Sequence, residues 1–125
     1  MHSGLILFAH GARDPKWSAP FESVARQVRQ AHPGKHVALA FLECMTPNLV
    51  QAGTALVMQG CTRVTVLPLF LGTGGHVRRD LPMLLDELRR AHLGVDFALL
   101  PAIGEIESVV AAMAQVAGAA LQDGG

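Results

Sequence analysis

The sequence predicts an α/β fold, a three-layer sandwich in which a four-stranded parallel sheet of order 2-1-3-4 lies between helices. Two observations lead to this prediction. Strand-like apolar runs and helix-like amphipathic segments alternate four times along 125 residues, and no internal repeat or linker interrupts them. Successive strand–helix units form parallel sheets, because right-handed crossovers put helices on both faces. The length is that of one domain, residues 1–125.

Four segments are predicted as strands. The first, residues 4–9, is apolar almost throughout, which is typical of a strand buried on both faces. The others are residues 36–42, 63–71 and 95–100. Pro68 lies in the third, where a central strand needs a backbone N–H, so we expect a bulge or the end of the strand there.

Four segments are predicted as helices. Residues 18–31 repeat apolar side chains at helical spacing. We expect Thr46 to be the N-cap and Pro47 the first residue of a second helix that ends at Gly60. A third helix follows residues 72–75, and a last one carries an apolar stripe before a frayed end at residues 123–125. The stripes of these two helices are Leu81, Leu84, Leu85 and Leu88, and Ile106, Val109, Val110, Met113, Val116, Ala117 and Leu121.

Composition excludes several classes of protein. Half of the residues are hydrophobic, which excludes intrinsic disorder, and ten basic residues balance ten acidic ones. Zero net charge argues against broad nucleic-acid binding. The longest apolar run, residues 64–71, is too short for a membrane helix, and no signal peptide begins the chain, so we expect a cytoplasmic protein without membrane or nucleic-acid partners. Cys44 and Cys61 are expected to be free thiols.

Two histidines follow strands that are predicted to be neighbours. His10 comes directly after the first strand, and His76 follows the third. Open parallel sheets bind ligands at the carboxyl ends of such strands, so we expect both imidazoles at one crevice. Neutral imidazole binds divalent cobalt, nickel or iron, or accepts a proton. Two imidazoles form an incomplete ligand shell, which suits a metal that is passed on.

Other residues are expected near the same crevice. Glu43, at the end of the second strand, is equally interpretable as a third ligand or proton acceptor and as a solvated carboxylate. The loop Gly72-Thr73-Gly74-Gly75 matches no phosphate-binding pattern, and it is either a backbone platform for a flat ligand or an ordinary turn. Cations gather near these loops, where they would bind a carboxylate or phosphate or simply be surface charge. They are Arg13, Lys16, Arg78 and Arg79.

Taken in order along the chain, these motifs resemble the CbiX/SirB sirohydrochlorin chelatases. The matching segments are residues 10–15, 68–72, 75–82 and 101–104, together with Glu43 upstream of Pro47, and Ala12 departs from the serine common in the family. The resemblance implies insertion of a divalent metal (cobalt, with iron or nickel as alternatives) into sirohydrochlorin, during cobalamin or sirohaem biosynthesis. The metal would be a substrate, with no permanently bound cofactor.

The resemblance also implies a single domain with a chelatase-like fold, and roles for individual residues. His10 would be proton acceptor and metal ligand, and His76 would be the second ligand. The loop Leu71, Gly72, Thr73, Gly74, Gly75 and His76 would lie along the macrocycle, Met45 would touch it, and Arg13 and Arg78 would face its carboxylates. The short chain would work as a homodimer.

Two other functions remain open from the sequence. A non-enzymatic carrier of metal or tetrapyrrole would use the same binding residues. Phosphoryl transfer through a phosphohistidine is less favoured, because such enzymes place Arg before the histidine and here Ala9 precedes His10.

Overall fold

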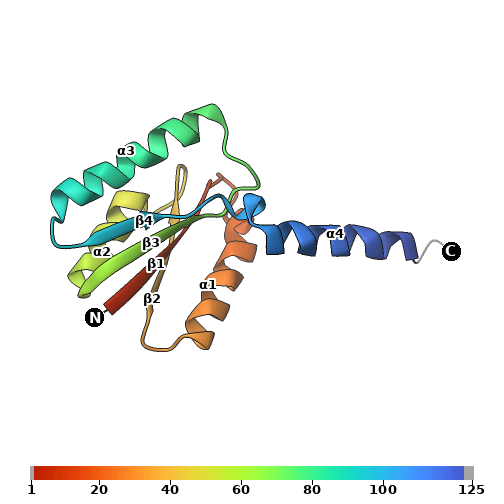
Figure 1. Cartoon of the computed structure of the whole chain (residues 1–125), viewed down its shortest axis with the longest axis horizontal. Helices are drawn as coiled ribbons and strands as arrows, with labels where there is room; N and C mark the ends of the chain where they lie inside the picture. The colour runs from red at the N-terminus through yellow and green to blue at the C-terminus, as the bar shows by residue number, and fades with distance from the viewer. Residues whose placement is uncertain (1, 123–125) are drawn as a thin grey trace.

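One parallel sheet forms the centre of the protein (Figure 1). The computed structural model describes residues 2–122, with strands β1 (His2–Ala9), β2 (His36–Phe41), β3 (Cys61–Pro68) and β4 (Asp96–Leu99). Their order is β2-β1-β3-β4, which confirms the predicted topology. Leu7 of β1 pairs with Leu39 on one side and with Leu67 on the other. The carboxyl ends of β1 and β3 are therefore neighbours.

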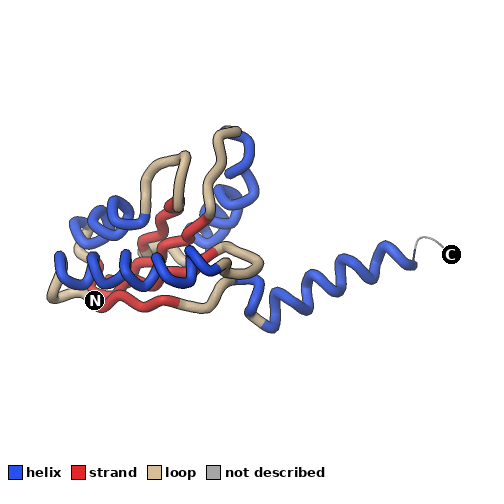
Figure 2. Tube along the Cα trace, turned by 90° about the horizontal axis from the view of Figure 1, so that it is seen from above, coloured by secondary structure: helices blue, strands red, loops and turns tan. Residues whose placement is uncertain are grey.

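Helices lie on both faces of the sheet. Helix α1 (Ala19–Ala31), preceded by the short helix η1 (Pro15–Ser18), packs over β2 and β1. Helices α2 (Leu49–Met58) and α3 (Gly75–Ala91) pack together on the opposite face. The short helix η2 (Ile103–Glu105) leads into α4 (Glu107–Gln122), which extends away from the rest of the chain (Figures 1 and 2).

The main hydrophobic core lies between the sheet and helices α2 and α3. Its fully buried side chains include Ile6, Phe8, Val64, Leu85 and Leu88. A Cβ on Gly53 would lie 2.8 Å from a methyl carbon of Leu88, so this glycine lets α2 and α3 approach closely. The absence of a side chain at this position thus fixes how the two helices pack.

Helix α2 begins later than the sequence indicates. Thr46 and Pro47 lie in the preceding loop, because the Phe41 N–H donates to the Pro47 carbonyl oxygen (2.9 Å) and ties it to the end of β2. The N-cap is Asn48, whose side chain accepts from the Gln51 N–H at 2.8 Å. The Gln51 side chain accepts in return from the Asn48 N–H at 2.8 Å. This reciprocal capping box, and not Thr46, starts the helix.

Strand boundaries also differ from the prediction in places. β3 ends at Pro68, which confirms that this proline closes the strand, and residues 69–71 form a loop. β2 ends at Phe41, so Glu43 lies two residues beyond it. Cys44 is exposed and Cys61 is buried, both as free thiols. Burial raises the pKa of the Cys61 thiol.

Helix α4 contains the predicted apolar stripe, but none of its residues is buried. The predicted frayed end, residues 123–125, lies outside the described residues. Within residues 2–122, every helix falls short of the length and apolar character that a membrane crossing requires.

Candidate metal and substrate site

His10 and His76 lie in the wall of one cavity at the carboxyl edge of the sheet. The cavity has a volume of about 510 Å³, which is within the range of small-molecule sites. Its lining residues are His10, Leu69, Phe70, Leu71, Gly72, Gly74, Gly75, His76 and Val77. The buried strand β1 delivers His10 directly after Ala9, and the first turn of α3 delivers His76. The segments that follow β1 and β3 thus contribute one imidazole each, His76 from the first turn of α3 and not from the loop that the sequence predicted.

The His10 ring is held between an aromatic ring and a carboxylate. Phe70 meets it edge to face, with ring centroids 5.9 Å apart and planes inclined by 66°. Glu43 Oε1 lies 3.4 Å from His10 Nδ1. A carboxylate at Nδ1 favours the tautomer with its proton on that nitrogen, so Nε2 carries the lone pair that binds a metal or takes a proton. Both side chains are about half exposed, which leaves the pair open to a ligand.

Backbone contacts fix the position of Glu43 beside His10. The Leu42 N–H donates to the Ala9 carbonyl at 2.9 Å, and the Glu43 N–H donates to the His10 carbonyl at 3.1 Å. Gly11 has a φ of +92°, and a Cβ there would lie 1.9 Å from the Glu43 carbonyl oxygen. Only glycine fits this close approach of the two loops.

The loop after β3 exposes its backbone to the cavity. Gly72, Gly74 and Gly75 all line it, and a Cβ on any of them would meet no atom within 4 Å. Leu71, at the start of the loop, is 72% exposed. Exposed backbone with a projecting apolar side chain is a surface on which a planar ligand can lie.

Four predicted substrate contacts lie elsewhere than the histidine cavity. Thr73 accepts from Arg78 Nε and Nη2 at 3.4 Å each, and both residues line a separate cavity beside Pro101. Met45 lines a cavity of about 500 Å³ against α1, because the Phe41–Pro47 hydrogen bond turns its loop that way. Exposed Arg13 is not among the lining residues of the histidine cavity.

Two contributors were missed by sequence reasoning. Phe70 orients His10 and lines the cavity, and Gly11 allows the Glu43 loop to approach. The third strand was predicted over residues 63–71, so Phe70 was expected inside that strand and not in a loop at the crevice. Nothing at Gly11 beyond its position after His10 indicated a contact with the second loop.

The two candidate metal ligands, His10 and His76, would fill only part of a metal ion's coordination shell. Across residues 2–122, no three His, Cys, Asp or Glu side chains group together as a metal site. A structural zinc site would need four ligands, so the two imidazoles fit transient metal binding better than permanent retention.

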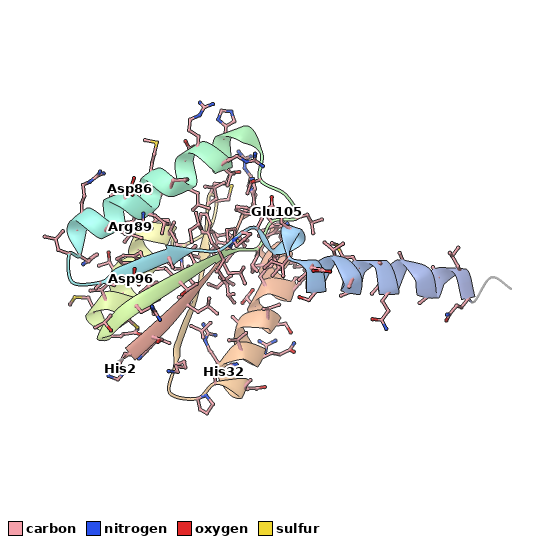
Figure 3. The ribbon with its side chains drawn as sticks, in the orientation of Figure 1. His2, His32, Asp86, Arg89, Asp96 and Glu105 are labelled. Atoms are coloured by element: carbon pink, nitrogen blue, oxygen red, sulfur yellow. The ribbon has the colours of Figure 1, made fainter. Side chains whose placement is uncertain are left out.

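The remaining histidines lie away from this cavity. Figure 3 shows His2 and His32 at the end of the sheet opposite Glu105 and the start of α4. The His2 and His36 rings are 5.9 Å apart, at the beginning of their strands. His92 follows α3 and lies 3.5 Å from the Thr54 hydroxyl.

Comparisons with known proteins find a matching family and several similar chains. The CbiX family model matches residues 4–120. A sirohydrochlorin cobaltochelatase of Saccharolobus islandicus is 30% identical over 101 residues, covering 78% of this chain and 77% of the relative. A CbiX protein from Marinobacter aquaeolei VT8 has a TM-score of 0.83 at 31% identity, covering 97% of this chain and 98% of that one.

A third similar protein is about twice as long. The sirohydrochlorin chelatase SirB from Bacillus subtilis subspecies spizizenii, in complex with cobalt, has a TM-score of 0.78 at 25% identity. The match covers 90% of this chain but only 48% of SirB. The family match over nearly the whole sequence, together with these similarities, shows that the chain belongs to the CbiX family.

Proposed function

We propose that this protein inserts a divalent metal, cobalt first among the candidates, into sirohydrochlorin. The observation that carries the proposal is the presence of two imidazoles, His10 and His76, in the wall of one cavity. Relatives named sirohydrochlorin cobaltochelatase and the cobalt complex of SirB support the choice of substrate and metal. Iron stays a second candidate, because SirB is also known with Fe³⁺.

The chemistry exchanges two pyrrole N–H protons for one divalent ion. The metal binds first to His10 Nε2 and His76, which give it an open shell from which it can leave. As the ring nitrogens take the ion, both of their protons must be removed. Once the ion has left Nε2, His10 accepts the two protons at that atom one after the other, and the Glu43 carboxylate at Nδ1 stabilises the imidazolium each time. Solvent then receives the protons through the exposed side of the pair.

The loop after β3 provides the surface for the macrocycle. Its open glycines and Leu71 would lie against one ring face, within reach of His76. A nearly flat free macrocycle presents its inner nitrogens poorly, so holding it in a puckered form would speed insertion. Arg13, in the loop after β1, and Arg78, in the first turns of α3, would bind the carboxylates at the edge of sirohydrochlorin if these segments close on the substrate. Met45 would reach the macrocycle only if the loop after β2 also moved toward it.

We further propose that the working unit is a homodimer, since the chain matches about half of SirB. In either state, the proposed substrates are sirohydrochlorin and the divalent metal ion, and the protein would hold no resident cofactor.

Turnover separates this function from that of a carrier. Purified protein, at a concentration well below that of sirohydrochlorin, is mixed with cobalt, iron or nickel, and the product is followed by absorption. Many equivalents of metallated product per chain, fastest with cobalt, are expected. A yield that stops at one equivalent would instead establish the carrier function.

A further inference from the structure

Helix α4 has an apolar surface that no other part of residues 2–122 covers. Its sixteen residues include one charged side chain, Glu107, and none of the sixteen is buried. Val110, Met113, Val116 and Leu121 are between 41% and 82% exposed. The helix extends away from the sheet in both views (Figures 1 and 2). Isolated helices of this length are marginal in water, and one so apolar needs a partner surface.

The sheet has a matching surface without a helix. On the α2–α3 side, Val64 and Val66 of β3 and Phe97 of β4 are buried almost completely. Strand alternation turns the open strip, defined as Thr65, Leu67 and Ala98, to the α1 side, where all three are partly exposed. Thr65 shares a cavity of about 330 Å³ with Val28 of α1, which confirms its side. Parallel sheets are normally covered on both faces, so this strip lacks a layer.

The chain's own α4 is directed away from the open strip. The Gly104 N–H in η2 donates to the Phe70 carbonyl at 3.0 Å, and a Cβ on Gly104 would lie 2.0 Å from the Leu71 carbonyl oxygen. This tight backbone contact fixes η2 to the loop after β3, and α4 begins two residues after η2. A second copy supplies both missing parts, because it has an uncovered helix and an uncovered strip.

We propose that α4 of one copy packs on the open strip of a second copy, and that the exchange is reciprocal. Each strip then gains the helix that completes its layer, and a two-fold axis relates the copies. The exposed ion pair Arg63–Asp96 (3.6 Å), on the same side of β3 and β4, would form part of the polar rim. Because α4 leaves the body beside the histidine cavity, the partner lies on that side. This inference concerns assembly and does not require the proposed activity.

A charge on the docking face of α4 tests the proposal directly. Sedimentation equilibrium of the wild-type chain should give twice the monomer mass of 13.2 kDa. Met113→Asp should weaken dimerisation at least 100-fold. Gln115→Asp, which puts the same charge on the opposite side of the helix, should leave it within about threefold of wild type. Circular dichroism checks that both variants keep the fold.

Site-specific cross-linking tests the exchange itself. In a Cys44→Ser background, chains with Thr65→Cys and chains with Met113→Cys are co-expressed and treated with a short bismaleimide. The proposal predicts covalent dimers from the pair and few from either variant alone. A wild-type chain that stays monomeric at all concentrations, or a dimer that Met113→Asp leaves unaffected, would overturn the proposal. So would a cross-link that forms inside one chain when a single chain carries both Thr65→Cys and Met113→Cys.

Discussion

Gly11 places its Cα against the carbonyl oxygen of Glu43, so closely that a Cβ there would lie 1.9 Å from that oxygen. This contact joins the loop that carries His10 to the loop that carries its carboxylate partner. The histidine–carboxylate pair is therefore set by backbone packing between two loops, in addition to the 3.4 Å contact of the side chains.

A methyl group at Gly11 should disrupt this pair. Gly11→Ala combines a positive φ with a backbone clash, and we expect it to cost on the order of 3 kcal/mol of unfolding free energy. Gly34→Ala is the matched control, because its φ is +87° but nothing lies within 4 Å of the added Cβ. It should cost about 1 kcal/mol. Equal losses for the two variants in urea unfolding would refute the close approach.

The carboxylate of Glu43 should matter for insertion through its charge. Glu43→Gln keeps an acceptor near His10 Nδ1 but removes the charge that stabilises an imidazolium, so insertion should slow by about 10- to 100-fold. Glu87→Gln, at an exposed carboxylate on α3, should leave the rate unchanged. An unaltered rate in Glu43→Gln would mean that Glu43 is only a solvated side chain.

The start of α2 can be tested by truncating its cap. Asn48→Ala removes the acceptor of the Gln51 N–H and should destabilise the protein by about 1 kcal/mol. Thr46→Ala, at the residue that the sequence suggested as the cap, should change stability by less than about 0.5 kcal/mol. The two midpoints in chemical denaturation report the difference, and a larger effect at Thr46 would contradict the assignment.

The two cysteines should react at very different rates. Burial raises the pKa of the Cys61 thiol, so the folded state favours its neutral form. The resulting contribution to folding stability is complete below the thiol pKa of the unfolded chain, about 8.5, and is lost as the pH rises through the higher pKa of the folded state. Exposed Cys44 should be alkylated in the native protein, and Cys61 only on unfolding, as peptide mass spectrometry can show. Rapid modification of Cys61 in the folded chain would be inconsistent with its burial.

The sequence predicted the sheet well because its signals are local. The apolar run of β1 and the alternation of strand and helix gave the order β2-β1-β3-β4, and this order placed His10 and His76 at one cavity. Positions inside loops were predicted less well. Met45 and Thr73 face other cavities, because hydrogen bonds such as Phe41–Pro47 decide how each loop turns. The apolar stripe of α4 was visible in the sequence, but its exposure in the folded chain was not.

The rate of cobalt insertion into sirohydrochlorin by three histidine variants tests whether His10 and His76 form the metal site. His10→Ala and His76→Ala should each lower the rate at least about 100-fold, because each removes a ligand and His10 also removes the proton acceptor. His32→Ala, at the opposite end of the sheet, should retain the wild-type rate. Wild-type rates in folded His10→Ala and His76→Ala would show that these two histidines do not carry out metal insertion.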